Sequence, residues 1–230
     1  MMDWIHPLFI VIMVRVVSIN TNGLRSKEKV ELVLEAFSAD ILCLQETHWT
    51  EPYMDNVRQR WNGLMYVSNG TVRACGVAIL VKHDVVSNLT LLCADTVGRM
   101  VGVGFTYQDM EYSLYNVYAP NNEIERRVMF MSMVGLCGKN CLLVGDFNVW
   151  MDRLDASSSA HFSSDSSRGA LLRLMRDEDW VDIWRERNPD KRVFSRRQVV
   201  RGELKQSRID LSLAHREVAH LVVGVKYSHT

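Results

Sequence analysis

The chain has 230 residues, of which 47% are hydrophobic and 23% charged, and its formal net charge is zero. This length and composition predict one globular domain with one compact core. A neutral chain has no global field that would draw it onto nucleic acid, so any DNA binding must depend on a local basic patch.

The N-terminal segment contains a short apolar run over residues 7–14. The run is too short for a transmembrane helix, and we expect no membrane association. It does not fit a signal peptide, because Asp3 is the only early charge and no small-residue cleavage site follows. We expect residues 1–13 to be an upstream extension or a mis-assigned start that is not native, and the domain to begin at residue 14. A longer first strand is the alternative.

The first half of the chain alternates strand and helix and then becomes strand-rich. Residues 14–19 and 40–45 are predicted strands, and apolar residues at helical spacing predict a helix over 26–37 between them. Strand, helix and strand with short connections indicate a layered α/β unit. Four more strands are predicted without intervening helices, at 76–81, 86–93, 99–107 and 111–118.

The second half is predicted to return to mixed structure. Pro120 ends a strand, and Asn121 or Asn122 can cap a helix that reaches about Leu136. The serine-rich stretch 157–167 is predicted to be a mobile loop. Residues 169–184 are predicted to be helical, with Leu172 and Met175 facing inward. The final predicted strands span 193–195, 208–214 and 221–227.

Cysteine usage predicts a reduced, intracellular protein. The count is odd and no Cys-x-x-Cys pair occurs, and two of the cysteines flank only a Gly-Lys-Asn turn, which is too little for a zinc site. We expect all five to be reduced thiols; they are Cys43, Cys75, Cys93, Cys137 and Cys141.

Polar residues follow several of the predicted buried strands. Asp146 and Asn148 follow the apolar run 141–144, which predicts a carboxylate and a carboxamide at the edge of a sheet. Glu46 also ends an apolar strand, where a charge is costly unless it is paired or bound to a metal. The alternatives are a plain Asx turn for the first pair and a capping or surface glutamate for Glu46.

Five such strand ends occur together, at 18–24 (Ser-Ile-Asn-Thr-Asn-Gly-Leu), 44–48 (Leu-Gln-Glu-Thr-His), 116–121 (Asn-Val-Tyr-Ala-Pro-Asn), 145–148 (Gly-Asp-Phe-Asn) and 207–210 (Ser-Arg-Ile-Asp). In this order they resemble the exonuclease–endonuclease–phosphatase family, in the apurinic-endonuclease-like branch carried by LINE-type (non-LTR) retrotransposons. The resemblance implies a four-layered α/β sandwich of the DNase I-like kind, in which two packed β-sheets are flanked by helices.

The same resemblance implies roles for individual residues. Glu46 would be the principal ligand of Mg²⁺, or of Mn²⁺ as an alternative, with Asn20 beside it. Asp146 would orient or deprotonate the attacking water or serve the leaving group, and Asn148 would hold water or phosphate. Tyr118 would donate a hydrogen bond to a phosphate oxygen, although a tyrosine that ends a strand is otherwise a core residue with a wet tip.

In the family an aspartate matching Asp210 orients a histidine from a later Ser-Asp-His motif. That motif is absent here, and the sequence ends in Tyr-Ser-His-Thr. We therefore expect residues 14–230 to be an endonuclease domain truncated before the motif, and we favour this over His229 being a displaced equivalent. A departure also precedes Asp210, where Ser195 can substitute for the hydroxyl residue that the family often has.

The segment from residue 185 to 208 is positive within a neutral chain, and such a patch can neutralise DNA phosphates. A solvated loop with scattered arginines is the alternative. The predicted DNA-binding residues are Asn22, Arg196, Arg197, Arg201, Lys205 and Arg208.

We therefore predict a metal-dependent endonuclease that nicks one strand of double-stranded DNA and leaves a 3′-hydroxyl primer for reverse transcription. A reverse transcriptase domain is expected downstream in a longer polyprotein, and the site of action is expected to be intracellular, in the nucleus. Two alternatives stay open. One is a truncated or decayed transposon fragment without activity; the other is an abasic-site repair nuclease or a phosphatase on the same fold.

Overall fold

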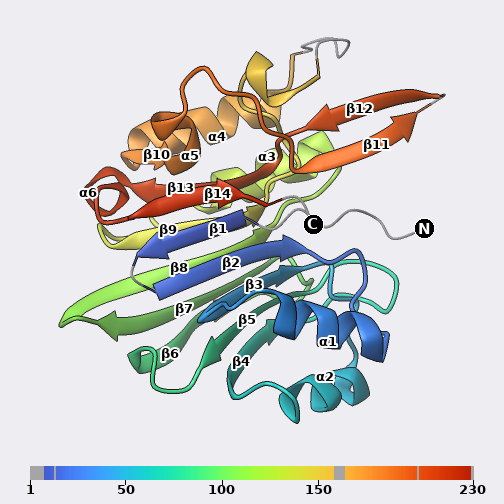
Figure 1. Ribbon diagram of the computed structural model, residues 1–230. Coiled ribbons are helices and arrows are strands. Elements are labelled where there is room, and N and C mark those ends of the chain that lie inside the picture. The colour runs from blue at the N-terminus through green and yellow to red at the C-terminus, as the bar shows by residue number, and fades with distance from the viewer. Residues whose placement is uncertain (1–7, 13, 158–163, 201, 229–230) are drawn as a thin grey trace.

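The computed structural model describes residues 8–12, 14–157, 164–200 and 202–228. Two six-stranded sheets lie face to face (Figure 1). The first has the order β14-β1-β2-β3-β5-β4, with bounds Gly224–Tyr227, Leu8–Ile12, Val14–Asn20, Ile41–Gln45, Val77–Lys82 and Gly63–Ser68. The second has the order β10-β13-β9-β8-β7-β6, with bounds Trp180–Asp182, Asp210–His215, Cys141–Asp146, Met110–Tyr118, Met100–Tyr107 and Ser87–Ala94.

Helices cover the outer face of each sheet, so the molecule has four layers (Figure 1). Helices α1 (Lys27–Ala36) and α2 (Glu51–Arg58) pack on the first sheet, and α3 (Glu123–Ser132) and α4 (Ser166–Asp177) pack on the second. The short helices α5 (Ile183–Arg187) and α6 (Arg216–Ala219) flank β13. The predicted four-layered α/β sandwich is confirmed.

Strand β3 shows why the central strands are apolar at every position. Ile41 and Cys43 point into the core between the sheets, whereas Leu42 and Leu44 point into the core beneath α1 and α2. Successive side chains of a strand face opposite sides, and both sides are covered here. Strand β9 behaves in the same way between the inter-sheet core and the core beneath α3 and α4.

The helix starts follow their capping residues. The Ser26 hydroxyl accepts from the Lys29 backbone N–H at 3.2 Å, and the Asn122 side chain accepts from the Ile124 N–H at 2.9 Å. Helix α3 ends at Ser132, four residues before the predicted end at Leu136. Gly135 takes a left-handed conformation (φ 71°), which terminates helical geometry.

The predicted helix over 169–184 is wrong in its second half. Helix α4 starts earlier, at Ser166, and ends at Asp177. Asp179 then takes a positive φ of 51°, and residues 180–182 form β10 before α5 begins. Leu172 is 48% exposed rather than inward-facing, and Leu171 and Leu174 fill the core instead.

Other boundaries also differ from the predictions. Residues 193–195 form no strand, the strand predicted from 208 begins at Asp210, and β14 begins only at Gly224. A two-stranded hairpin that was not predicted, β11 (Arg196–Val200) with β12 (Glu203–Ser207), projects from the body of the domain (Figure 1). Within the predicted serine-rich loop, residues 158–163 lie outside the described part of the chain.

The N-terminal apolar run belongs to the first sheet. Residues 8–12 form β1, which pairs antiparallel with both β2 and β14. Leu8 and Ile10 are fully buried in the inter-sheet core. The fold therefore begins before residue 14, which corrects the predicted boundary, and β1 is a separate strand rather than a longer first strand. That residues 1–13 are not native stays a prediction.

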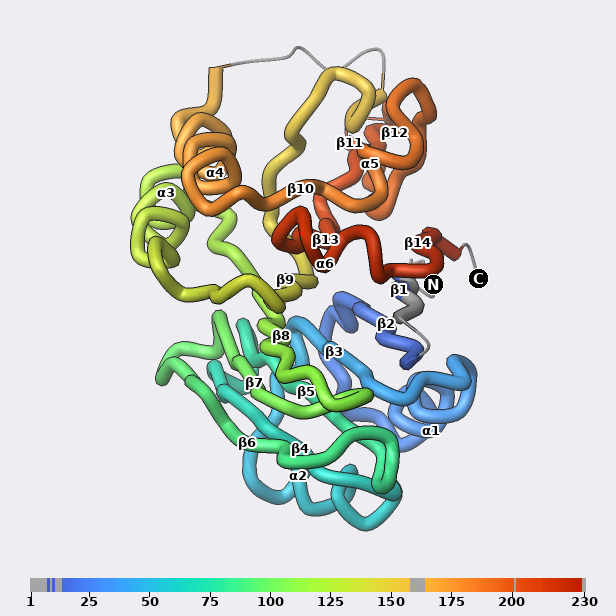
Figure 2. Tube along the Cα trace, turned by 90° about the vertical axis from the view of Figure 1, so that its left-hand side faces the viewer, coloured from blue at the N-terminus to red at the C-terminus, as the bar shows by residue number. Residues whose placement is uncertain are grey.

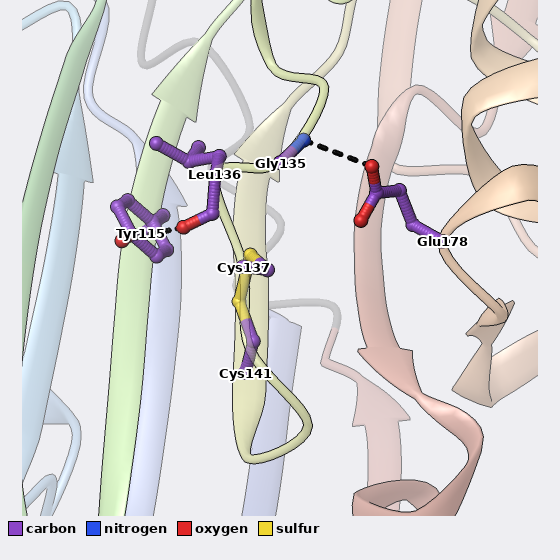
Figure 3. Close-up of a disulfide and its surroundings, with 6 residues drawn as sticks. All are labelled: Tyr115, Gly135, Leu136, Cys137, Cys141 and Glu178. Atoms are coloured by element: carbon purple, nitrogen blue, oxygen red, sulfur yellow. Dashed lines mark hydrogen bonds between the residues drawn. A yellow bond between two sulfur atoms is a disulfide. The ribbon is translucent and has the colours of Figure 1, made fainter.

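Two of the five cysteines form a disulfide, so the expectation of five reduced thiols is wrong for this pair (Figure 3). The turn between Cys137 and Cys141 brings their Cα atoms to 5.5 Å, within the range that a disulfide requires. Nearby, the Tyr115 hydroxyl donates to the Leu136 carbonyl at 3.1 Å (Figure 3). Cys43, Cys75 and Cys93 are free thiols.

Among the described residues, none of the helices is long and apolar enough to span a membrane.

Candidate active site

The predicted site residues meet where strands of both sheets end. Asn20 ends β2, and its neighbour in the parallel pair is Gln45, the last residue of β3. Asp146 ends β9 and lies opposite Asp210 across the antiparallel pair with β13. These strand ends open into a cleft of about 390 Å³. Its lining comprises Asn20, Asn22, Glu46, Asn121, Asp146, Asn148, Ser195, Arg196, Arg197, Gln198, Ile209 and Asp210.

Asn20 joins the two sheets at the floor of this cleft. Its Nδ2 donates to Glu46 Oε1 and to Asp146 Oδ2, each at 2.9 Å. One neutral amide therefore holds two carboxylates that would otherwise repel each other. Its Oδ1 accepts from the backbone N–H of Asn22 at 3.0 Å, which fixes the orientation of the amide.

Glu46 takes an unusual backbone conformation directly after β3. Its φ of 51° is costly for a residue with a side chain, and such positions cluster at functional sites. The Gly23 N–H and the Thr21 hydroxyl both donate to the Glu46 carbonyl, at 2.7 and 3.0 Å. His48 Nε2 lies 3.7 Å from Glu46 Oε2. Burial lowers the pKa of His48, and the charge of Glu46 opposes this.

Burial raises the pKa of Asp146 to about 6, and the negative charge of Glu46 adds to this effect. The Asn20 amide, the Asn148 N–H and the charge of Arg196 act in the opposite direction. The Asn148 N–H donates to Asp146 Oδ1 at 2.8 Å, and Asn148 Nδ2 donates to the Ala119 carbonyl at 2.8 Å. Asp146 is therefore buried, fixed by hydrogen bonds and ready to exchange a proton near neutral pH.

Asp210 is held by Ser195. The Ser195 hydroxyl oxygen accepts from the Ile209 and Asp210 N–H groups, both at 3.1 Å, and the hydroxyl donates to the Asp210 carboxylate. Burial and the neighbouring charge of Asp146 raise the pKa of Asp210. The Tyr227 hydroxyl donates to the Asp210 carbonyl at 2.5 Å. None of the described residues that line the cleft is a histidine, and His229 lies outside the described residues.

Tyr118 lies beside the acidic pair. Its hydroxyl donates to the Glu46 carboxylate, and burial together with this bond raises its pKa, so the phenol stays protonated. The guanidinium of Arg99 lies 4.8 Å from the centre of the Tyr118 ring. Arg99 was not predicted as a site residue, because no local pattern distinguishes it from other surface arginines.

A buried amide pair beneath the cleft was also missed. Asn116 Nδ2 donates to the Leu44 and Ala78 carbonyls at 2.9 Å each, and its Oδ1 accepts from Gln45 Nε2 at 2.6 Å. Because Asn116 belongs to the second sheet and Gln45 to the first, the pair connects the sheets next to Glu46. Asn116 and Gln45 belong to the motifs at 116–121 and 44–48, and membership in these motifs is the sequence signal that could have identified them.

Four of the six predicted DNA-binding residues are exposed. Asn22, Arg196 and Arg197 line the cleft, and Lys205 is exposed on the same hairpin as the two arginines. Arg208 is fully buried instead and forms ion pairs with Asp155 and Asp182, both at 2.7 Å. Arg208 thus cannot contact DNA, which corrects the prediction. Arg201 lies outside the described residues.

The donor set fits a hard divalent cation. Glu46 offers a carboxylate oxygen beside the Asn20 amide, at the floor of a polar cleft. Mg²⁺ binds oxygen through one or two protein carboxylates and keeps its other positions for water and substrate phosphate. A larger cage is not needed for this ion, and among the described residues no group of three or more His, Cys, Asp or Glu side chains is arranged to hold a metal.

The chain is similar to known proteins in sequence and in fold. A sequence model of the Endonuclease/Exonuclease/phosphatase family matches residues 17–228. The chain is 30% identical over 201 residues to the "Transposon TX1 uncharacterized 149 kDa protein" of Xenopus laevis, in a match that covers 84% of this chain and 15% of that protein. The chain therefore spans only a small part of this relative's length.

Two solved structures show the same fold. An AP endonuclease from Archaeoglobus fulgidus superposes with a TM-score of 0.69 at 19% identity, covering 90% of this chain and 89% of the other. The endonuclease domain of TRAS1, a telomere-specific non-LTR retrotransposon, superposes with a TM-score of 0.62 at 16% identity, covering 92% and 89%. At these identities the likeness concerns the fold alone.

Proposed function

The chain belongs to the Endonuclease/Exonuclease/phosphatase family, and from this premise we propose that it is a Mg²⁺-dependent endonuclease that nicks one strand of double-stranded DNA. The observation that carries the proposal is the Asn20 amide bridging Glu46 and Asp146 at the floor of the cleft. Arg196 and Arg197 at the wall of the same cleft supply positive charge for a phosphate backbone.

Glu46, with Asn20 beside it, is the residue that would hold the metal. When bound, Mg²⁺ supplies charge neutralisation for the phosphoryl oxygens. The other roles in the proposed reaction are assigned to side chains of the protein. Tyr118 keeps its proton, and by turning its hydroxyl from Glu46 it can donate a hydrogen bond to a non-bridging phosphate oxygen. Asn148 borders the same space, and its backbone N–H keeps Asp146 in position.

Proton transfer is assigned to the two aspartates. Asp146, with a pKa of about 6, is mostly ionised at neutral pH and can accept a proton from the attacking water. The water oxygen forms a bond to phosphorus, and the bond from phosphorus to the 3′-oxygen breaks. Asp210 lines the same cleft, and its pKa is raised by burial and by the charge of Asp146, so we assign to it the return of a proton to the departing 3′-oxygen. The products are a 5′-phosphate and a 3′-hydroxyl.

The proposed biological role is to make the 3′-hydroxyl that primes reverse transcription of a retrotransposon in the nucleus. The relative of 149 kDa, of which the matched region is 15%, supports a longer polyprotein. We propose that a reverse transcriptase domain follows the endonuclease there.

The test is nicking of supercoiled plasmid DNA in Mg²⁺ by the wild-type chain, Asp146→Ala and the control Asp55→Ala, which removes an exposed carboxylate of α2. We expect wild type and control to nick equally, and Asp146→Ala to lose about 10²-fold or more. A DNA polymerase should extend the nicked product. Equal nicking by Asp146→Ala, or no nicking by a folded wild-type chain, would overturn the proposal.

The assay must also distinguish DNA nicking from the reactions of other proteins that have this fold. An oligonucleotide with one abasic site and a phosphomonoester are the matched probes. Incision confined to the abasic oligonucleotide would make the protein a repair nuclease, and turnover of the phosphomonoester alone would make it a phosphatase.

A further inference from the structure

Helix α3 is apolar on the side that faces away from its sheet. Phe130 of the helix and Met133, directly after its end, are buried against the second sheet. Met131 of the helix and Val134 of the turn that follows it are, however, 58% and 68% exposed, and Ile124 and Val128 of the helix are exposed more than half as well. Ile124, Val128 and Met131 are spaced four and three residues apart and so share one face. A helix with a second apolar face has a surface that this domain does not cover.

A groove runs between helix α4 and the C-terminal end of this apolar surface, where Met131 and Val134 line it. The two helices lie next to each other on the outer side of the second sheet (Figure 2) and are joined by the ion pair of Arg126 with Asp165 at 2.8 Å. The groove has a volume of about 450 Å³. Gly169 and Ala170 of α4 leave it open because they carry almost no side chain, and Phe130 and Leu174 form apolar parts of its wall.

The charges at the groove are unbalanced. Arg127 of α3 and Arg173 of α4 both line it and are exposed, and within the described part of the chain neither makes an ion pair. The acidic residue of the lining, Asp177, already pairs with Arg176 at 2.9 Å. The groove therefore combines an apolar surface with two uncompensated positive charges.

We propose that the α3–α4 groove binds an amphipathic helix of a partner protein, with apolar side chains toward the groove and Asp or Glu residues toward Arg127 and Arg173. A helix laid into an apolar groove is a recurring mode of recognition, and acidic side chains at its flanks would complement the two arginines. None of the residues that line the groove lines the catalytic cleft. Docking here leaves the cleft open to DNA.

A second copy of this chain is a poorer occupant. In a symmetric dimer the same patch meets itself, so Arg127 and Arg173 would face like charges. DNA is also a poorer occupant, since Met131, Val134 and Phe130 offer no donor to phosphates. The acidic amphipathic helix is the partner that satisfies both features of the groove.

The test uses a fluorescein-labelled helical peptide with leucines at i, i+3, i+4 and i+7 and glutamates at the flanking positions, and a second peptide in which lysines replace the glutamates. Fluorescence anisotropy with the full chain should show saturable binding of the glutamate peptide with a Kd on the order of micromolar, and at least about tenfold weaker binding of the lysine peptide. Met131→Glu/Val134→Glu should abolish binding. Arg127→Glu/Arg173→Glu should reverse the preference between the two peptides.

Leu91→Glu is the matched control, because it places a charge on an exposed apolar residue of β6 outside the groove and should bind like the wild type. Circular dichroism and plasmid nicking unchanged from the wild type would show that the variants are folded. Absence of saturable binding to the wild-type chain, equal binding of the two peptides, or full binding by Met131→Glu/Val134→Glu would overturn the proposal. So would a concentration-dependent dimer in sedimentation velocity that Met131→Glu/Val134→Glu dissociates, because the occupant would then be a second copy.

Discussion

Replacing Arg208 by methionine should destabilise the fold rather than weaken DNA binding. The guanidinium is fully buried and forms ion pairs with Asp155 Oδ1 and Asp182 Oδ2, both at 2.7 Å. Methionine fills similar space but removes the charge, which leaves Asp182 without this cation and Asp155 with Arg185 alone. Breaking a buried pair by removing one partner costs about 3–5 kcal/mol of unfolding free energy.

The loss should depend on pH. Burial by itself would raise the pKa of Asp155, but the hydrogen bonds and charges of Arg208 and Arg185 more than offset this and hold the pKa below its ordinary value. A carboxyl with a depressed pKa in the folded state contributes stability above its unfolded pKa, and this is lost as the pH falls through the folded pKa. The difference between wild type and Arg208→Met should therefore be full at neutral pH and shrink below a pH of about 4.

Urea unfolding followed by tryptophan fluorescence, at neutral and acidic pH, measures this difference. Arg197→Met is the matched control, because Arg197 is exposed on β11 and belongs to the same basic segment. The control should keep wild-type stability and lose DNA affinity. A cost for Arg208→Met below about 1 kcal/mol, or one that does not change with pH, would refute the reasoning about the buried pair.

Three further predictions follow from the site and from the disulfide. In the metal-free protein, NMR titration of the Asp146 carboxyl should show a midpoint at about 6, and Asn20→Ala should raise it because the lost hydrogen bond favours the charged form. Nicking should accordingly fall as the pH drops through that pKa, and an unshifted midpoint in Asn20→Ala would contradict the assigned bridge. Removing both Arg197 and Lys205 should lower the slope of log affinity for DNA against log salt concentration by about 2, measured by anisotropy at several salt concentrations. Reduction of the disulfide between Cys137 and Cys141 should lower the unfolding free energy by at most about 2 kcal/mol, because the closed loop is short; Cys137→Ser should make urea unfolding insensitive to reductant.

Three residues of the site could be predicted because each stands at the end of an apolar strand. Asn20, Glu46 and Asp146 follow runs that are buried on both faces, and the pairing of those strands places their ends at one edge. The periodicity of the chain could not say which strands are neighbours. Here the resemblance to a known family supplied the order.

The elements and contacts that were not predicted have no distinctive local sequence pattern. Helix α2 buries only Met54 and Val57, so its apolar stripe is too short to stand out. The strands of the β11–β12 hairpin are mostly exposed and show no alternation. Arg208 stands among other arginines in the sequence, and only the fold shows that Asp155 and Asp182 surround it. The spacing of Cys137 and Cys141 likewise does not reveal whether a turn brings them together.

The buried amides of Gln45 and Asn116 explain how two separate sheets can present one catalytic geometry. An apolar interface between two sheets tolerates small sliding, because apolar contacts are not directional. Hydrogen bonds are directional, and three of them cross between the sheets at Asn116, which bonds to Gln45 and to the Leu44 and Ala78 carbonyls of the first sheet. These three bonds fix the relative position of the sheets, and Gln45 is held within its own sheet by its bond to Ser18. Gln45 ends β3 directly before Glu46, and Asn116 lies two residues before Tyr118 in β8. A displacement of either sheet would break several buried hydrogen bonds before it separated Glu46 from Asp146, so the interior polar pair sets the spacing that the Asn20 amide then bridges.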